Sequence, residues 1–232
     1  MTAINSPPLC CGGRIFTDFA MCNRFSKNLG LQDSNRGIQG SVIFSAAGIS
    51  NWSVPDVVKN GRRVKVTVVG GGGAGGRAVA GGGGGGGGLA SKLVDLTGVS
   101  SVTITVGAGG TPAALGTSTT SGGAGGSSSF GGYLSATGGD GGSTPSAGKG
   151  GIGVGGTLNT SLGPGCAGAM GSAYCSGSGG GAGGPGSVSS SVNNGTNAIG
   201  PGGGGSGAAQ GSDTSVSCIA GIGKPGYVLI EW

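Results

Sequence analysis

Apolar and polar residues alternate in only a few short stretches of the chain, and glycine fills much of the sequence between them. Alternation with a period of two is typical of a β-strand that buries one face. This pattern occurs in RVKVTVV (63–69), SVTITV (101–106) and the closing YVLIEW (227–232). In the last stretch Val228, Ile230 and Trp232 share one face. We therefore predict a strand in each stretch.

Two further strands are predicted near residue 50. SVIFS (41–45) and NWSVP (51–55) are rich in β-branched and aromatic residues, and AAGIS (46–50) between them is a turn candidate. The simplest arrangement is a hairpin. In that arrangement Phe44 and Trp52 pair across the two strands or cap the core.

Helical periodicity is confined to residues 1–40. In RIFTDFAMCNRFSKNLG, Ile15, Phe19, Cys22 and Leu29 fall near one face, with Phe16 and Phe25 at its margin. Gly30 is a natural C-terminal stop, so we predict a helix over 14–29. The apolar face of such a helix must be covered by another surface. We expect residues 1–40 to be an attachment segment that docks on another protein through Ile15, Phe16, Phe19 and Phe25; folding back onto residues 41–232 is the alternative.

Glycine supplies 64 of the 232 residues, about four times its usual share of roughly 7%. A chain without Cβ atoms can form the left-handed polyglycine II helix, which has three residues per turn and no internal hydrogen bonds. Several such helices side by side can exchange backbone hydrogen bonds, and close approach then requires glycine. The glycine-rich tracts cover residues 70–76, 81–88, 107–110, 122–126, 138–142, 148–156, 177–186 and 200–207.

Six variable segments join these tracts: TPAALGTSTTS, SSSFGGYLSAT, STPSA, TLNTSLGPGCAGAMGSAYCS, SVSSSVNNGTNAI and AAQGSDTSVSCIA. The expected fold for residues 41–232 is therefore mostly β and irregular. It is a sandwich of stacked polyglycine II helices framed by short strands, with loops at its ends. A disordered glycine-rich region is the alternative.

The sequence does not favour an enzyme. VKVTVVGGGGAGG contains G-x-G-x-x-G after a strand, but only Arg77–Ala80 could begin the helix that a dinucleotide site needs. Eight glycines follow, and each costs about 1 kcal/mol in a helix. The chain has no histidine, its carboxylates are isolated, and no cysteine has a base beside it. We expect no cofactor.

Charge and cysteine content exclude other classes. Ten of the twelve Lys and Arg residues precede residue 93, but they are scattered and few aromatic residues accompany them, so nucleic acid is not an expected partner. No apolar run reaches 18 residues, and the N-terminus lacks a secretory signal, so we expect synthesis in a cytoplasm and no membrane insertion. Six cysteines without a C-x-x-C pair do not suggest zinc. Cys166 and Cys175 could close a disulfide loop; buried thiols are the alternative.

The order of these motifs resembles a known family. NWSVP, RVKVTVVGGGGAGG, GGGGGGGGLASKLVDLTGVSSVTITVGAGG and the closing GKPGYVLIEW are similar to the glycine-rich domain of bacteriophage tail fibres and adhesins, over about residues 41–232. The resemblance extends to the distal adhesins of T-even-like long tail fibres. It implies a virion protein at a tail or fibre tip that binds a bacterial surface receptor. Residues 1–40 lack the tryptophan-rich attachment segment of those adhesins, so the attachment partner stays open.

In such adhesins the loops between glycine tracts contact the receptor. On that basis the candidate contacts are Phe130, Tyr133, Asn159, Met170, Tyr174, Asn193, Asn194 and Asn197. Phe130 and Tyr133 could instead plug one end of the sandwich, and Asn193-Asn194-Gly195 could be only a tight turn.

The partners expected from this resemblance are a bacterial protein, pilus or glycan, and other tail proteins bound through residues 1–40. A homotrimer is one possible assembly. Two other functions stay open: a structural virion component that binds no receptor, and a non-phage glycine-rich structural or ice-binding protein. Ice binding would need one regular face of small side chains with a strict three-residue period.

Overall fold

The computed structural model describes residues 10–11, 14–15, 37–112, 114–170, 174–189, 192–211, 213 and 215–232. The chain divides into two compact units, Met1–Gln39 and Gly40–Trp232. In the first unit β1 (Cys10–Cys11) pairs with β2 (Arg14–Ile15) in antiparallel fashion. The helix predicted over 14–29 is therefore wrong at its first two residues, Arg14 and Ile15, which form the strand β2. Residues 16–29, and with them Phe16, Phe19 and Phe25, lie outside the described residues.

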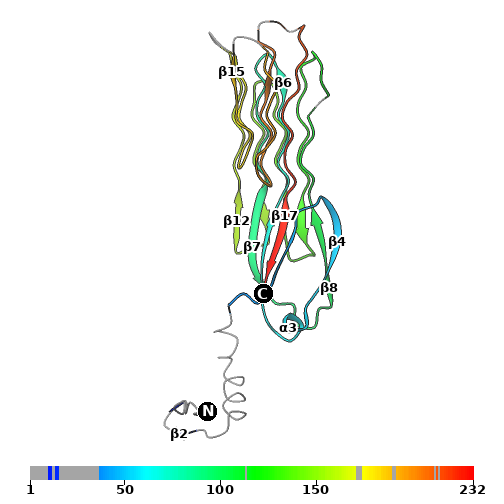
Figure 1. Ribbon diagram of the computed structural model, residues 1–232, viewed down its shortest axis with the longest axis vertical. Coiled ribbons are helices and arrows are strands. Elements are labelled where there is room, and N and C mark those ends of the chain that lie inside the picture. Colours follow the sequence, from blue (N-terminus) through cyan, green and yellow to red (C-terminus); the bar gives the residue numbers. More distant parts are fainter. Residues whose placement is uncertain are drawn as a thin grey trace, which may run out of the picture. The chain divides into compact units, whose positions relative to one another are not determined.

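Two five-stranded antiparallel sheets form one end of the second unit (Figure 1). The first sheet has the order β12 (Leu158–Ser161), β7 (Gly88–Val94), β5 (Val64–Val69), β17 (Tyr227–Glu231) and β3 (Ser41–Phe44). The second sheet has the order β11 (Gly153–Val154), β10 (Leu134–Ala136), β9 (Ser128–Phe130), β8 (Ser101–Val106) and β4 (Gly48–Ser53). A single helical turn, α3 (Asp56–Lys59), follows β4.

The hydrophobic core lies between these two sheets. Alternate residues of each strand face inward, so Val66 and Ile230 from the first sheet and Ile104 from the second are fully buried. The three strands predicted from alternation are confirmed as β5, β8 and β17. Trp52 is buried in this core. Its ring centroid lies 6.1 Å from that of Phe130 and 5.7 Å from that of Trp232.

The hairpin predicted around residue 50 does not form, although a strand occurs near each predicted one; β4 begins at Gly48, within the predicted turn, and ends at Ser53. β3 pairs with β17 in the first sheet, whereas β4 pairs with β8 in the second. The short connection between them therefore crosses from one sheet to the other. Phe44 is only partly buried against the core, and its cross-strand partner is Val228.

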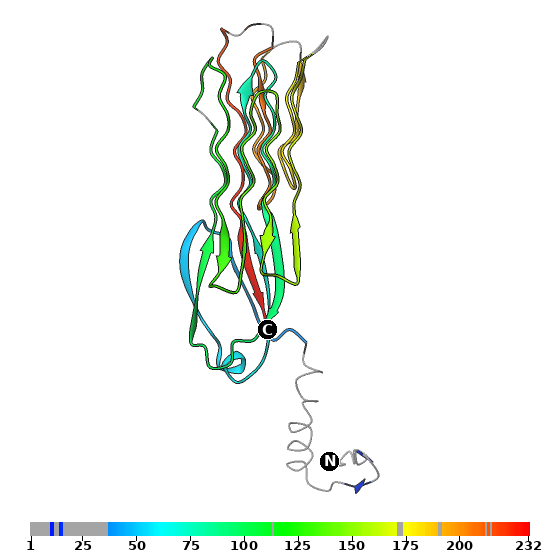
Figure 2. The ribbon, with the colours of Figure 1, turned by 180° about the vertical axis from the view of Figure 1, so that it is seen from behind.

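Most strands of both sheets continue directly into glycine-rich segments, which run side by side away from the sheets (Figures 1 and 2). β5 leads into residues 70–76, for example, and residues 81–87 lead into β7. The segments obey a three-residue period, since every third N–H group bonds to the same neighbour. In segment 70–77, residues 70, 73 and 76 donate to segment 82–88, residues 71, 74 and 77 to segment 120–126, and residues 72 and 75 to segment 221–224.

Segment 81–88 shows how densely these helices pack, because it is bonded to neighbours on all sides. It donates to segments 137–143, 163–166 and 202–208, and it accepts from segments 70–76, 148–151 and 177–180. The stacked polyglycine II sandwich predicted from the sequence is therefore confirmed. Backbone hydrogen bonds, rather than side-chain packing, connect its helices.

The register of each strand pair is preserved in the glycine helices that extend it. In β5 and β7, Val69 lies opposite Leu89. Just beyond the strands, Gly70 donates to Gly88, and further along Gly76 donates to Gly82. The sum of the two residue numbers stays the same throughout, so the strands align the glycine helices above them.

Glycine is required in the stack mainly because of close backbone approach. A Cβ atom on Gly72 would fall within 3.0 Å of the carbonyl oxygen of Gly203, and one on Gly85 within 3.0 Å of that of Lys149. Neither glycine has a positive φ. Positive φ occurs elsewhere, as at Gly131 (φ 49°) in the turn between β9 and β10.

Segments 177–186 and 195–207 add a further layer over the glycine helices of the first sheet. Gly177 and Gly180 donate to Gly81 and Gly84, and Gly205 donates to Gly73. At the end remote from the two large sheets, short strands close the structure (Figure 1). They are β6 (Arg77–Ala78) paired with β16 (Ala208–Ala209), and the three-stranded sheet β13 (Ala169–Met170), β14 (Tyr174–Cys175) and β15 (Val188–Ser189).

Candidate functional site

The loops that join the glycine helices at the end remote from the large sheets gather into one area, which we call the distal surface (Figures 1 and 2). Each loop leaves one glycine helix and enters another, so the stack determines where it begins and ends. The distal surface consists of the described residues within 77–80, 111–121, 143–147, 168–176, 187–194 and 208–219.

Arg77 connects several parts of the distal surface. Its side chain is buried, with 6% of its area exposed. Nε donates to the carbonyl oxygen of Ser118 at 2.7 Å, and Nη1 donates to those of Ala114 and Cys218. Nη2 donates to the hydroxyl of Thr120 at 3.2 Å. All four acceptors are neutral oxygen atoms, so the guanidinium charge is solvated by loop backbone and a hydroxyl group rather than by a carboxylate.

Gln210 makes a second connection between the same loops. Its amide nitrogen donates to the carbonyl oxygen of Thr117 at 2.6 Å and to that of Val216 at 3.4 Å. Gly116 and Cys218 also exchange backbone hydrogen bonds. Burial raises the pKa of the Cys218 thiol, and the nearby Arg77 charge opposes this increase. The thiol therefore stays protonated at neutral pH and packs as a small apolar group.

The sheet β13–β14–β15 forms a separate part of the distal surface. Met170 lies opposite Tyr174, and Tyr174 lies opposite Ser189. Met170 is 65% exposed and Val188 is 71% exposed, whereas Tyr174 is half-buried. This sheet brings together the two residues that the sequence placed between Cys166 and Cys175 as contact candidates.

The distal surface is almost uncharged. Asp213 and the buried Arg77 are its only ionisable residues other than cysteine and tyrosine. Its exposed large apolar side chains are Leu115, Met170, Val188 and Val216. Backbone groups, hydroxyls and amides surround these side chains, so the surface can offer apolar contact and neutral hydrogen bonds to a partner.

Asp213 carries the one exposed charge. Its Oδ1 accepts hydrogen bonds from the hydroxyl and the backbone N–H of Ser215. These two bonds hold the pKa of the Asp213 carboxyl below its ordinary value, the hydroxyl bond having the larger effect.

The predicted asparagine contacts have structural roles in the stack. Asn193 forms a backbone bridge with Ala209. The Oδ1 atoms of Asn194 and Asn197, three residues apart, accept from the N–H groups of Ile219 and Ile222. Each of these two side chains thus adds one hydrogen bond that follows the three-residue period of the backbone hydrogen bonds in the stack. Both side chains remain exposed; Asn194 belongs to the distal surface, whereas Asn197 lies outside it.

Three further predicted contacts lie on or beside the large sheets, away from the distal surface. Phe130 is fully buried in the core, so it cannot contact a receptor. β9 directs its ring inward against Trp52, in the core between the two large sheets. Tyr133, 36% exposed, packs beside Phe130 with ring centroids 5.7 Å apart. Asn159 is on β12, where its side chain bonds to both backbone groups of Gly156.

The disulfide suggested for Cys166 and Cys175 is not formed, because both are free thiols. The carbonyl oxygen of Cys166 accepts from Gly83 in the stack, whereas Cys175 lies in β14 opposite Ala169. The loop between them is closed by strand pairing instead.

Arg77 and Gln210 are two site residues that are not predicted from the sequence. The available signal was the isolation of Arg77, a single cation among glycine and alanine. A long charged side chain in a segment that must be buried needs acceptors, and only loops can supply free carbonyl groups there.

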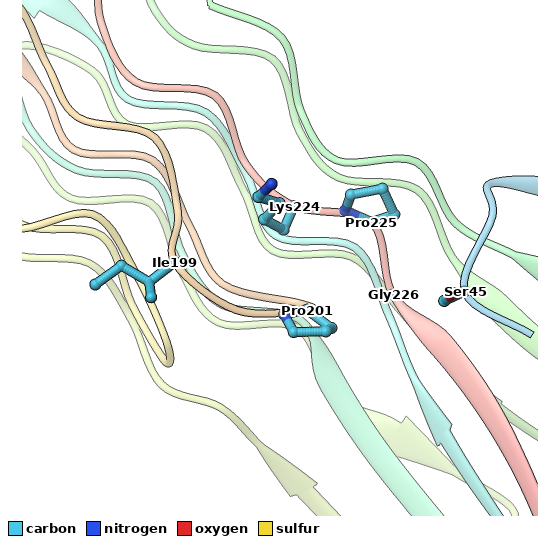
Figure 3. Close-up of a pocket in the computed structure, with 6 residues that line it drawn as sticks. All are labelled: Ser45, Ile199, Pro201, Lys224, Pro225 and Gly226. Atoms are coloured by element: carbon cyan, nitrogen blue, oxygen red, sulfur yellow. The ribbon is translucent and has the colours of Figure 1, made fainter. Parts of the chain in front are cut away.

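A small pocket lies beside the stack rather than on the distal surface (Figure 3). It has a volume of about 220 Å³ and is lined by Ser45, Ile199, Pro201, Lys224, Pro225 and Gly226. Its walls are mainly apolar, and Lys224 provides the single charge. No group of three or more potential metal-binding side chains occurs in the described parts of the chain.

Comparison with known proteins identifies a family. The family model described as a glycine-rich domain matches residues 45–232, which is most of the chain. No curated protein matches the sequence. Within the described residues, no helix has the length and apolar character needed to cross a membrane.

Proposed function

The chain belongs to the family of glycine-rich domains, and from this premise we propose that it is a bacteriophage tail or tail-fibre tip protein that binds a receptor on the bacterial surface. The distal surface makes the contact. Residues 1–40 attach the protein to other tail proteins in the virion. The phage assignment rests on the resemblance of the strand-to-glycine junctions and the closing strand to tail-fibre adhesins.

The observation that carries the proposal is the separation of scaffold from loops. The glycine stack is held by backbone hydrogen bonds, and a Cβ atom is excluded at many of its positions. The loops at its distal end differ in length and sequence, and they meet on one surface. A rigid scaffold that tolerates loop variation is the arrangement used by proteins that recognise diverse partners.

The chemistry of the distal surface fits recognition without charge pairing. Met170 and Leu115 are exposed by 65% and 63%, and Tyr174 lies beside Met170. Tyrosine and methionine offer large contact areas, and tyrosine does so at low cost in conformational entropy. The receptor can be a protein, a pilus or a neutral glycan. A trimeric fibre end is one assembly that could carry the protein.

Binding of the purified full chain to whole bacteria tests the proposal, with intact phage from the same source as competitor. We expect saturable binding to host strains that the phage reduces. Tyr174→Ala should weaken this binding by about tenfold if the side chain lies in the contact. The matched control is Tyr133→Ala. It also removes a partly exposed tyrosine, but one that lies beside the large sheets, and it should leave the affinity unchanged.

Two results would contradict the proposal. A folded chain that binds no strain in a broad panel would favour a structural virion role. An equal loss of affinity in Tyr174→Ala and Tyr133→Ala would show that the distal surface is not the specific contact.

A second candidate, ice binding, is favoured by one observation. In the layer formed by segments 107–111, 121–127, 137–143 and 146–152, exposed residues recur at intervals of three. Examples are Ser121, Ala124 and Ser127. The charged residues Asp140 and Lys149 interrupt this face, and this argues against ice binding. Inhibition of ice recrystallisation by the purified chain is the measurement that would support it.

A further inference from the structure

We propose that Arg77 is a positioning residue that holds two distal loops, residues 114–120 and 215–218, as a single unit. The two loops then present one shared face to the receptor; this consequence for binding rests on the proposed function. Neither loop can be exchanged alone without disturbing the other.

The backbone of Arg77 is held by the stack. It follows the glycine helix 70–76, and its N–H and C=O groups both bond to Thr120, the residue at which the first loop enters segment 120–126 of the stack. In β6 it also lies opposite Ala208 of β16. The starting point of the side chain is therefore determined by the scaffold, while its guanidinium group reaches the loops.

The contacts of the guanidinium join both loops at once. Ala114, Ser118 and Thr120 belong to the first loop, and Cys218 belongs to the second. Hydrogen bonds from a charged donor are about twice as strong as neutral ones. Burying this charge is unfavourable unless every acceptor stays in place, so the loops and Arg77 stabilise one another.

Lysine cannot replace this arrangement. The planar guanidinium donates in several fixed directions from one group, whereas an ammonium is a compact point charge on a flexible chain. The observed acceptors lie around Nε, Nη1 and Nη2 of Arg77. We therefore expect Arg77→Lys to recover only part of the effect of Arg77.

Gln210 reinforces the same pair of loops. It bonds to Thr117 in the first loop and to Val216 in the second. The sheet β13–β14–β15, by contrast, is held by its own strand pairs and by the bond from Ser176 N–H to the carbonyl oxygen of Ser187. The distal surface therefore contains two modules, one organised by Arg77 and one organised by strand pairing.

Amide hydrogen exchange followed by NMR on the full chain tests the inference. The Cys218 N–H, which donates to Gly116 at 3.1 Å, reports on the loop pair. The Ser176 N–H reports on the second module, and the Gly85 N–H, which donates to Asp140, reports on the stack. Exchange of such amides follows the free energy of local opening.

In Arg77→Met we expect exchange at Cys218 to accelerate by at least about tenfold, because several charge-assisted bonds are lost. Ser176 and Gly85 should keep their rates. Arg77→Lys should show an intermediate rate at Cys218. The matched control, Arg63→Met, removes an exposed arginine and should change none of the three. An unchanged rate at Cys218, or equal acceleration at all three amides, would overturn the inference.

Thr120→Val provides a second test should Arg77→Met fail to fold. It removes one acceptor of Arg77 at nearly constant volume, and we expect about threefold faster exchange at Cys218 with Gly85 unchanged. No acceleration would contradict the inference. Where the wild type binds bacteria, Arg77→Met should weaken binding by about tenfold, and unchanged affinity would refute the shared face. Where no strain is bound, the proposed function fails, but the exchange rates still decide the coupling.

Discussion

At the scale of single residues, glycine in this protein serves mainly to let backbones touch. Six neighbouring helices surround segment 81–88, and each approaches closely enough to exchange hydrogen bonds. A side chain there has no space, whatever its polarity. The usual preference for apolar residues in a protein interior is thus replaced by a preference for no side chain.

Gly85→Ala should destabilise the fold strongly. The added methyl group would overlap the carbonyl oxygen of Lys149, and both belong to a backbone with neighbours on several sides. We expect a loss of about 3 kcal/mol in the free energy of unfolding, measured by chemical denaturation. Gly132→Ala is the control, since no atom lies within 4 Å of its added Cβ. Equal stability of the two variants would contradict the packing described for the stack.

Phe130→Ala should act on stability and not on receptor contact. Phe130 has no exposed area and packs against Trp52 and Tyr133. Its removal should cost about 4 kcal/mol in the free energy of unfolding. Binding per folded molecule should stay the same at a temperature where the variant is folded. Reduced affinity of the folded variant would restore Phe130 as a contact residue.

At the scale of elements, the sequence predicted strands well and their partners poorly. The alternation in SVTITV gives β8 with its inward residues Val102 and Ile104. Proximity along the chain suggested that β3 pairs with β4. The actual partner of β3 is β17, far away in sequence, and no local pattern encodes such a pairing. Sheet assignment depends on the whole core.

The glycine tracts illustrate a similar division. Their tendency to stack follows from composition, because only backbones can meet where side chains are missing. Which helix meets which could not be predicted, since Gly82, Gly83 and Gly84 are identical in sequence and bond to three different segments. The register of each glycine helix against its neighbours is determined by the β-strand with which it is continuous. Likewise, the sequence predicts a loop at Phe130 because serine and glycine surround it in SSSFGGYLSAT, whereas in the structure Phe130 is the last residue of the short strand β9.

The loop around Asp213 should respond to acid. The pKa of this carboxyl is lower in the folded protein than its ordinary value of 3.8, owing to the two bonds from Ser215. The two hydrogen bonds therefore stabilise the loop at pH values above the ordinary pKa. This stabilisation is lost as the pH falls through the lower pKa that the carboxyl has in the folded protein. We expect the Ser215 amide resonance to shift in that acidic range in an NMR titration. Asp213→Asn should abolish the transition, and a transition that persists in this variant would assign it to another group.

At the scale of the whole molecule, charge is distributed unequally between the two ends of the second unit. Exposed cations such as Arg63 and Lys65 are on or beside the large sheets, whereas the distal surface exposes one carboxylate. An interaction made by the distal surface should therefore be nearly independent of salt. Between about 0.05 M and 0.5 M salt we expect the affinity for host cells to change by less than about twofold. A steep decrease with salt would indicate that the basic end makes the contact.

The dense backbone bonding of the glycine helices also has a thermodynamic consequence. Unfolding them exposes mainly peptide groups to water, and exposure of polar surface lowers the heat capacity whereas exposure of apolar surface raises it. The heat-capacity change of unfolding should thus fall below the usual value of about 12–15 cal/mol/K per residue, as scanning calorimetry would measure. A small change flattens the curve of stability against temperature. The fold would then lose little stability over a wide range of temperatures.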